Sequence, residues 1–490
     1  MEIPRLPTQL HVIGGRRLEP ATGQTFSTCF PGTGEEVAQV ARGSREDVDR
    51  AVKAALDAFR AWRDLAPLDR SRMLRRLADF LVRHRDELAL LDTLDCGRPI
   101  TGTRRDVERS AEKIEFYAGF ADKIRGSVVA VSRSLFNYTR KEPYGVVGAI
   151  VPWNYPLSQA VVKLAPILAC GNTLVLKPAE QSPLSALRLG DLCLEAGIPS
   201  GVVNVVAGFG PEAGAALVEH PAVQKISFTG STAVGREIMA RGGIKSYTLE
   251  LGGKTPNVVF LDADLEQALE ASLYTVFNNS GQTCTAATRL LVQEAVADRF
   301  VDALIQRARE LRVGDPRDPS TRIGPLVSRE QRQRVEMYVA EGLREGATLA
   351  LGGSRPLDPA LERGFYFTPT IFLDVRPQMR IAQEEIFGPV LSVLSFADED
   401  EAIALANGVT YGLAATIWTN DVRRAHRLAA EVEAGLVWVN TVHALHPASP
   451  YGGYKESGIG LEMGLEAADE YMKTKSVWLN LGRYVSPWAR

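Results

Sequence analysis

The chain has 490 residues, of which 45% are hydrophobic and 23% are charged, and its formal net charge is −3. This length allows two or more domains with large buried cores, and the composition is ordinary for a soluble globular protein. The near-neutral charge predicts no nucleic-acid partner and no attraction to an anionic membrane surface. Apolar runs stay shorter than the ~18 residues of a membrane helix, and the start lacks a signal-peptide core, so the cytoplasm is the expected compartment.

The cysteines and histidines predict neither a disulfide framework nor a metal site. The five cysteines lie far apart, and no two of them form a CxxC pair. His443 and His446 are close in the sequence, but two histidines alone make an incomplete metal site, so we interpret them as loop residues.

The first part of the chain has helical patterns. Apolar residues recur at helical spacing over residues 44–62, where Ser44 and Asp47 are suited to cap the helix start. Further helical patterns cover residues 70–94 and 107–124.

Strands and helices then alternate along the chain. This rhythm predicts a parallel sheet with helices on both faces, which binds ligands at the carboxyl ends of its strands. The expected strands cover residues 146–152, 173–177, 202–207, 225–229 and 257–261, and the expected helices cover 184–196 and 212–220.

A second alternation after Pro256 predicts another α/β unit of similar size, with a cleft between the two units. Its expected elements are strands over 289–293 and 391–396 and a helix near 296–311. Residues 127–140 have a helix-poor pattern, which is typical of a hairpin arm, and 476–481 is expected to form another strand.

The stretch NSGQTCT, which ends in Cys284-Thr285, is the most informative short motif. Glycine and small polar neighbours leave a cysteine accessible to a substrate, whereas buried structural cysteines more often have aliphatic neighbours. A nucleophilic thiolate also needs a lowered pKa. From this stretch alone, a nucleophile and a structural cysteine are about equally supported.

The stretch LELGGK places Glu250 among apolar residues and beside two glycines. Burial raises the pKa of a carboxyl group, which suits a general base that works near neutral pH. A structural glutamate at the end of a helix, before a glycine turn, is the more common situation. A thiol and a nearby base together would allow acylation of the thiol followed by hydrolysis.

The stretch PWNYP directly follows an apolar strand, and its two prolines favour a rigid extended turn. Asn154 offers an amide donor that could stabilise a developing oxyanion. A purely structural Asx turn explains the same residues equally well.

Three further turns have features of a cofactor site. Lys177 and Glu180 follow a strand, and a carboxylate there accepts hydrogen bonds from ribose hydroxyls and repels a 2′-phosphate, which favours NAD over NADP. The glycine-rich turns 208–210 and 228–235 each place backbone N–H groups at a helix start, where phosphate binds. Neither turn is a GxGxxG fingerprint, so each is weak evidence alone.

Taken together, these motifs make the chain resemble the aldehyde dehydrogenase superfamily over nearly its full length. The matching stretches occur in the family's order: PWNYP, LKPAEQSPLSA, GFGPEAG, FTGST, LELGGK, GQTC, EEIFGPV and PYGGYKESGIG. The resemblance implies a Rossmann-like cofactor domain, an α/β catalytic domain and a small β oligomerisation arm, assembled as a homodimer or homotetramer. The implied parts are residues 1–124 and 141–252 for the NAD-binding domain, 253–455 for the catalytic domain, and 125–140 and 472–490 for the arm.

The resemblance also implies roles for individual residues. Cys284 matches the family nucleophile, Glu250 its general base and Asn154 its oxyanion donor, while Glu462 matches an acid that relays protons in some relatives. The implied cofactor-binding residues are Trp153, Lys177, Glu180, Gly210, Gly230, Ser231, Glu385 and Phe387. The implied reaction is oxidation of a small-molecule aldehyde to an acid with NAD, with NADP also possible, through a thioester that Glu250-activated water hydrolyses.

Two alternatives to this reaction remain. A CoA-acylating semialdehyde dehydrogenase would transfer the acyl group to CoA, but such relatives generally lack the base that Glu250 supplies. A non-catalytic protein that kept the fold would not be expected to retain Cys284, Glu250 and Asn154.

The substrate pocket resembles that of betaine aldehyde enzymes only in part. Tyr155 and Tyr451 occupy ring positions suited to a cationic substrate, but Asn278 and Val162 replace expected aromatics, and Arg109 replaces an acid at the pocket mouth. A positive residue there repels a quaternary ammonium and suits a carboxylate-bearing semialdehyde. We therefore expect no betaine aldehyde preference and leave aromatic, aliphatic and acidic aldehydes open. The other expected lining residues are Gln159, His443 and Leu445.

Overall fold

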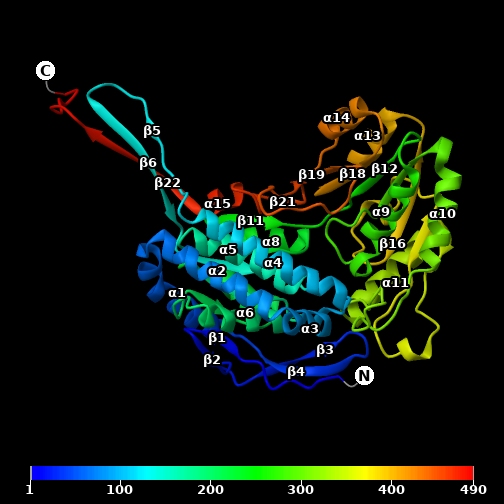
Figure 1. Cartoon of the computed structure of the whole chain (residues 1–490), viewed down its shortest axis with the longest axis horizontal. Coiled ribbons are helices and arrows are strands. Elements are labelled where there is room, and N and C mark those ends of the chain that lie inside the picture. Colours follow the sequence, from blue (N-terminus) through cyan, green and yellow to red (C-terminus); the bar gives the residue numbers. More distant parts are fainter. Residues whose placement is uncertain (1–2, 489–490) are drawn as a thin grey trace.

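The structure, a computed structural model, describes residues 3–488 (Figure 1). It contains two large β-sheets, in which the central strands run parallel, and a projecting arm. The predicted α/β class is confirmed. Residues 1–2 of the predicted cofactor domain and 489–490 of the predicted arm lie outside the described residues. The domain boundaries stay a prediction.

The first three predicted helices are present with changed bounds. α1 (Arg45–Asp64) begins with the expected capping box, in which the Ser44 N–H donates to Asp47 Oδ2 at 2.9 Å. The helical pattern predicted over residues 70–94 forms two helices, because the helix is interrupted at His84. α2 (Pro67–Arg83) and α3 (Arg85–Cys96) lie on either side of this break, and α4 (Ile100–Phe120) starts earlier than expected, directly after Pro99.

The first sheet has eight strands. Its five central strands are parallel, and antiparallel strands close both edges. The order across the sheet is β2 (Arg16–Leu18), β1 (His11–Ile13), β9 (Val203–Val205), β8 (Thr173–Lys177), β7 (Val146–Ile150), β10 (Val223–Thr229), β11 (Ser246–Glu250) and β21 (Gly458–Ile459).

Helices cover both faces of this sheet, because side chains along each strand alternate between the faces. Val147 and Ala149 of β7 belong to a core shared with α2, α4, α5 (Pro156–Ala169) and α6 (Leu184–Glu195). Val146 and Ile150 belong to the opposite core, shared with α1, α7 (Ala215–Glu219) and α8 (Thr232–Gly242). The helix expected over 212–220 begins instead as a π-helical turn, η1 (Gly210–Gly214), and continues as α7.

The second sheet has seven strands, all parallel except the edge strand β14. Its order is β14 (Thr348–Leu351), β15 (Thr370–Leu373), β16 (Val390–Phe396), β13 (Arg289–Gln293), β12 (Pro256–Val259), β18 (Ala414–Trp418) and β19 (Leu436–Val439). One face packs on α9 (Leu265–Phe277) and α10 (Ala297–Arg309). The other packs on α11 (Arg329–Arg344), α12 (Arg380–Gln383), α13 (Glu399–Asn407) and α14 (Val422–Glu431).

Short elements complete the fold. The hairpin of β3 (Thr25–Phe30) and β4 (Glu35–Ala41) was not expected from the sequence. β17 (Tyr411–Gly412) pairs with β20 (Tyr454–Lys455), α15 (Glu466–Glu470) precedes the last strand, and η2 (Asn278–Gly281), η3 (Glu294–Val296) and η4 (Pro359–Leu361) are single 3-10 turns.

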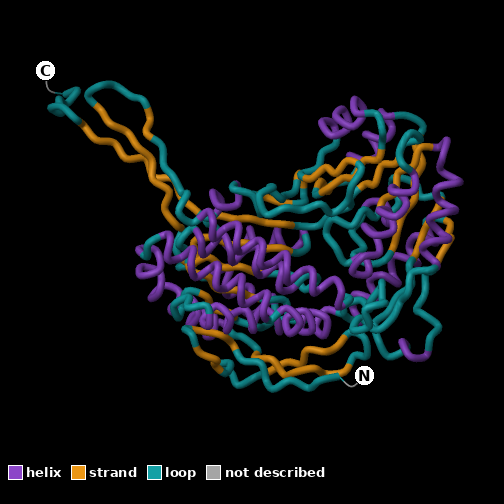
Figure 2. The backbone as a smooth tube through the Cα atoms, in the orientation of Figure 1, coloured by secondary structure: helices purple, strands orange, loops and turns teal. Residues whose placement is uncertain are grey.

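The expected arm is a three-stranded antiparallel ribbon that extends away from both sheets (Figures 1 and 2). β22 (Met472–Asn480) pairs residue by residue with β6 (Leu135–Pro143), and β5 (Val128–Val129) pairs with the outer side of β6. The last strand therefore begins at Met472 rather than at the expected residue 476. Phe136 and Trp478 are exposed on this ribbon.

Within residues 3–488, no helix has the length and apolar character needed to cross a bilayer. The same part of the chain contains no group of three or more histidine, cysteine, aspartate or glutamate side chains placed to hold a metal ion. All five cysteines are free thiols.

Candidate active site

The loop that carries Cys284 is held tightly before β13. Asn279 and Ser280 have φ angles of 52° and 56°, which non-glycine residues rarely adopt. The Ser280 hydroxyl donates to the Gly324 carbonyl at 2.8 Å, and the Gln282 side chain accepts from the Val327 N–H at 2.9 Å. These bonds offset the cost of the unusual backbone and place Cys284 at a defined point.

Asn154 lies against the same loop, in the turn after β7. Its side-chain amide donates to the Gln282 carbonyl at 3.0 Å, and Asn279 donates to the Asn154 carbonyl at 2.9 Å. A side-chain amide carries two N–H groups, so this bond leaves a second donor beside Cys284. The Asx-turn interpretation fails to account for this side chain, because its bond crosses to a segment 128 residues away.

Two cavities meet at Cys284, which lines both of them together with Gln159. The first, of about 130 Å³, is lined by all the predicted substrate residues, namely Arg109, Tyr155, Gln159, Asn278, His443, Leu445 and Tyr451, and by Glu462. The second, of about 280 Å³, is lined by the predicted cofactor residues Trp153, Gly230, Ser231, Glu385 and Phe387, and by Asn154. Tertiary structure thus separates the predicted substrate residues from five of the eight predicted cofactor residues, in two cavities that share one thiol. Lys177, Glu180 and Gly210 line neither cavity.

The Cys284 thiol has a tyrosine as its polar neighbour. The Tyr451 hydroxyl lies 3.2 Å from Cys284 Sγ. Burial raises the pKa of the thiol to about 12, and the Tyr451 hydrogen bond opposes this rise because it stabilises the thiolate. Burial therefore favours the neutral thiol of Cys284 over its thiolate.

Glu250 is the last residue of β11, so the helix-terminal interpretation is wrong. The strand pairs in parallel with β10 and, through Glu250 and Gly458, antiparallel with β21. Both carboxyl oxygens are buried without a hydrogen-bond partner. Burial, and then the charge of Glu462, raises the pKa of Glu250 well above its usual value.

Glu462 forms a buried ion pair with Lys163 of α5. The backbone of Glu462 also forms an antiparallel bridge with that of Tyr451, so the tyrosine beside Cys284 and the Glu462 carboxylate are held close together. Lys163 was not identified from the sequence, because a lysine in an apolar helix gives no sign of its distant partner.

The wall of the second cavity combines aromatic and polar groups. Trp153 and Phe387 meet edge to face with ring centroids 5.2 Å apart. Glu385 accepts a hydrogen bond from the Gly253 N–H at 3.0 Å, and burial raises the pKa of Glu385 to about 7. The Thr229 hydroxyl is buried in this wall without a partner.

The other predicted cofactor residues lie at strand ends of the first sheet. Lys177 is the last residue of β8, and its ammonium lies 3.1 Å from the Glu180 carboxylate. Gly210 opens the π-helical turn, and a side chain there would meet open space. Ser231 caps α8 by accepting from the Val234 N–H at 3.3 Å.

The substrate cavity has a polar rim around aromatic walls. The Tyr155 hydroxyl lies 2.8 Å from the Thr283 hydroxyl, and Asn278 donates to Tyr155 at 3.4 Å. His443 packs against Tyr274 and Trp438, and burial lowers the pKa of its imidazole to about 4, so the ring is neutral.

Several lining residues were missed from the sequence. Arg98 is buried, bonds Asp106 at 2.6 Å and lies 4.3 Å above the centre of the Tyr155 ring. For the members on α4, Asp106, Glu112 and Lys113, the helical spacing was the only available signal, and it does not reveal which face meets a cavity. Arg98 precedes this helix, and Tyr274 lies on α9. The missed charged and aromatic members are Arg98, Asp106, Glu112, Lys113 and Tyr274.

Comparison with known proteins agrees with this geometry. The sequence model of the aldehyde dehydrogenase family matches residues 18–477. DhaS of Bacillus subtilis (strain 168), named as a candidate aldehyde dehydrogenase, is 48% identical over 474 residues, which cover 96% of this chain and 95% of DhaS. The NAD+ complex of a Bacillus cereus aldehyde dehydrogenase is 44% identical with a TM-score of 0.95, covering 97% of each chain. A point mutant of Staphylococcus aureus betaine aldehyde dehydrogenase is 39% identical with a TM-score of 0.96, covering 98% of this chain and 97% of that one. The chain therefore belongs to the aldehyde dehydrogenase family.

Proposed function

We propose that the chain oxidises an aldehyde to a carboxylic acid with NAD, through a thiohemiacetal and a thioester on Cys284. The carrying observation is the position of this thiol where the two cavities meet. An aldehyde entering through one cavity and a nicotinamide entering through the other would reach the same sulfur. NAD, when bound, accepts the hydride of the thiohemiacetal.

The second cavity fits NAD chemically. Its buried Thr229 hydroxyl has no partner, and the N-terminus of α8 beside it carries no acidic residue in its first turn, which suits a pyrophosphate. Trp153 and Phe387 offer flat apolar walls, and Glu385 offers an acceptor for ribose hydroxyls. Lys177 and Glu180 would hold the adenosine ribose.

Cys284 and Asn154 would carry out acylation. Attack by sulfur on the carbonyl carbon puts negative charge on the aldehyde oxygen, and the second N–H of the Asn154 amide would stabilise it together with the Cys284 backbone N–H. The Cys284 thiol must lose its proton as the carbon–sulfur bond forms, and the nearby Glu250 carboxylate, whose pKa is raised, would accept it.

Glu250 would carry out deacylation. A carboxylate with a raised pKa is a strong base, so it accepts a proton from water readily and directs the hydroxide at the thioester. Glu462, paired with Lys163, lies close enough to raise the pKa of Glu250 and would receive that proton. This assignment favours hydrolysis over transfer to CoA.

Cofactor choice and assembly complete the proposal. The Bacillus cereus relative was solved with NAD+, and Glu180 favours the same cofactor here, with NADP a weaker substitute. The exposed ribbon of β5, β6 and β22 would join copies of the chain as a homodimer or homotetramer. The cytoplasmic location stays a prediction.

The test is NADH formation with betaine aldehyde, an aminoaldehyde, benzaldehyde, a medium-chain alkanal and succinic semialdehyde, each with NAD and NADP. We expect Cys284→Ser to abolish turnover. Glu250→Gln should release about one NADH per subunit and then slow by roughly 100-fold or more. A fully active Cys284→Ser enzyme would reject the nucleophile, and CoA-dependent turnover would favour the acylating alternative.

A further inference from the structure

The mouth of the substrate cavity carries two arginines without acidic partners. Arg105 and Arg109 lie four residues apart on α4 and therefore share one face of the helix. Arg109 lines the substrate cavity, and Arg105 lines a neighbouring cavity of about 310 Å³. Within the described residues, Arg109 has no ion pair, and Arg105 bonds only the Thr101 carbonyl of its own helix.

The neighbouring cavity continues the substrate cavity. Arg98, Tyr274 and Asn278 line both of them. This neighbouring cavity is also lined by Arg322, which has no ion pair among the described residues. A chain-like molecule that starts at Cys284 and extends into the neighbouring cavity would therefore pass Arg98 and reach further arginines.

Arg98 has an unfilled donor at this junction. Its side chain is 5% exposed, and its Nε and Nη2 bond Asp106 at 2.6 and 3.3 Å. Its Nη1 is buried and has no hydrogen-bond partner. A buried guanidinium N–H without an acceptor is costly, so this atom marks a position where a ligand oxygen would be stabilised.

The N-terminus of α4 adds to the positive electrostatic potential of the neighbouring cavity. The helix has no acidic residue in its first turn and no side-chain cap, and the Ile100 N–H donates to the Pro316 carbonyl at 2.8 Å, so no carboxylate of the first turn offsets its N-terminal partial positive charge. Pro99, Thr101 and Gly102 of this end line the neighbouring cavity.

Most acidic residues that line the two cavities are already paired with basic side chains. Asp106 is bonded to Arg98, Glu462 to Lys163, and Glu270 to Arg307. Glu112, one turn beyond Arg109, is the remaining acid of the two walls. Three unpaired arginines against one acid leave an excess of positive charge along the two cavities.

We propose that the physiological substrate is an aldehyde with a carboxylate at its other end, bound by Arg98, Arg105 and Arg109. This proposal rests on the proposed aldehyde oxidation and names its substrate class. Arginine binds carboxylates through paired, charge-assisted hydrogen bonds and repels a quaternary ammonium. Betaine aldehyde is accordingly a poor substrate.

The test compares aldehydes that differ only in the distal carboxylate: succinic, glutaric and adipic semialdehyde against butanal, pentanal and hexanal. We expect kcat/KM to be roughly ten-fold or more higher for at least one semialdehyde than for its matched alkanal. The advantage should shrink as ionic strength rises, because salt screens charges at an exposed mouth.

The variant Arg105→Ala/Arg109→Ala should lower this semialdehyde-to-alkanal ratio by about ten-fold. Arg104→Ala is the matched control, since Arg104 lies on the same helix but bonds Asp86 at 2.9 Å and lines neither cavity. The control should leave the ratio unchanged. Arg105→Glu/Arg109→Glu should shift the preference toward aminoaldehydes.

The affinities for the product acids test the same substrate class without any turnover. Calorimetry should show adipate binding the wild type more tightly than hexanoate, and the double alanine variant should lose this difference. Alkanals oxidised as well as semialdehydes, or a ratio that the arginine variants leave unmoved, would overturn the substrate class while leaving aldehyde oxidation intact. If no aldehyde is oxidised, the proposed function is rejected. If adipate and hexanoate bind equally well in that case, the substrate class is rejected too.

Discussion

At the scale of single residues, the contact between Cys284 and Tyr451 controls how readily the thiolate forms. The Tyr451 hydroxyl lies 3.2 Å from the sulfur and lowers the pKa of the thiol, whose net value is about 12 because burial raises it more strongly. Tyr451→Phe removes this hydrogen bond, so the pKa should rise and less thiolate should exist at any given pH. We expect alkylation of Cys284 by iodoacetamide to slow by roughly ten-fold.

The measurement is the alkylation rate of the cofactor-free enzyme as a function of pH. Tyr274→Phe is the control, because Tyr274 lines the same cavity without a hydrogen bond to the sulfur. Faster alkylation of Tyr451→Phe would show that the tyrosine shields the thiol rather than stabilising its anion.

Gly281 is required by both its conformation and its surroundings. Its φ is +74°, and a Cβ at this position would lie 2.0 Å from the Gly388 carbonyl oxygen. Gly281→Ala must therefore displace either the Cys284 loop or the segment that carries Phe387. We expect kcat/KM to fall by roughly 100-fold, because small shifts of a nucleophile are costly.

The matched control is Gly119→Ala in α4, where an added Cβ meets no atom within 4 Å. Alanine favours a helix by about 1 kcal/mol over glycine, so this variant should keep its activity and its thermal stability. Normal activity in Gly281→Ala would show that the loop can relax.

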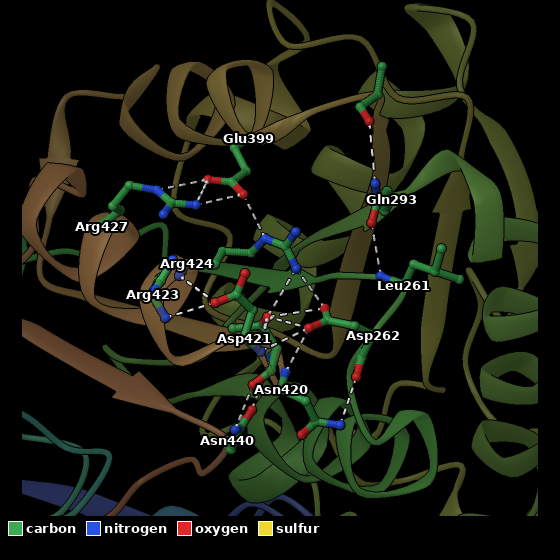
Figure 3. A network of polar contacts seen from close by, with 12 residues as sticks. Leu261, Asp262, Gln293, Glu399, Asn420, Asp421, Arg423, Arg424, Arg427 and Asn440 are labelled. Atoms are coloured by element: carbon green, nitrogen blue, oxygen red, sulfur yellow. Dashed lines mark hydrogen bonds and ion pairs between the residues drawn. The ribbon is translucent and has the colours of Figure 1, made fainter.

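At the scale of elements, a polar network fastens α13 and α14 to the second sheet (Figure 3). Asp262, after β12, accepts hydrogen bonds from the Thr419 hydroxyl, from the Asn420 and Asp421 N–H groups and from Arg424. Glu399 at the start of α13 bonds Arg424 and Arg427 of α14. The Asp262 carboxylate thus accepts hydrogen bonds from the backbone N–H groups that precede α14.

In Asp262→Ala the donors that bonded this carboxylate can form hydrogen bonds only with water. We expect the free energy of unfolding to fall by about 1–3 kcal/mol, measured by urea denaturation. Asp57→Ala is the control, because the Asp57–Lys53 pair on α1 is exposed, and such pairs contribute at most about 0.5 kcal/mol. Equal midpoints for the two variants would show that water replaces Asp262 fully.

β1 contains a buried histidine that makes stability depend on pH. His11 is fully buried, and burial lowers the pKa of its imidazole from 6.5 to about 4. The folded pKa lies below the unfolded one, so the unfolded chain binds the proton more strongly. This contribution to stability is complete above about pH 6.5 and is lost as the pH falls toward about 4.

His11→Leu removes this proton linkage. We expect the loss of stability between about pH 7 and about pH 5 to become smaller than in the wild type by about 2 kcal/mol. His84→Leu, at the partly exposed break between α2 and α3, is the control. An unchanged acid slope in His11→Leu would mean that His11 already takes up a proton in the folded state.

At the scale of the whole molecule, the arm exposes apolar surface that a second copy would cover. Phe136 is 39% exposed and Trp478 is 58% exposed, on paired strands of one ribbon. Phe136→Asp/Trp478→Asp should lower the molecular mass in light scattering to that of one chain of 53.4 kDa. Leu357→Asp, an exposed loop position, is the control, and an unchanged mass in the arm variant would place the interface elsewhere.

Elements with a strong local pattern agree well with the sequence predictions. The strands expected over 173–177 and 289–293 match β8 and β13 residue for residue, because each is a short run of β-favouring apolar residues between polar turns. The capping box of α1 was also read correctly. α5 was missed, because it is buried on nearly all sides and contains Pro166, so it lacks the periodicity of a surface helix.

The sequence by itself determined the α/β class, the family and many of the residues that line the two cavities, because ordered motifs such as PWNYP and GQTC keep chemistry and turn geometry together in short segments. Only the tertiary structure decided which residues meet. It paired Lys163 with Glu462 across 299 positions, and it placed Arg98 between two cavities with one donor unfilled. Such contacts depend on how sheets and helices pack, and local spacing along the chain carries no record of them.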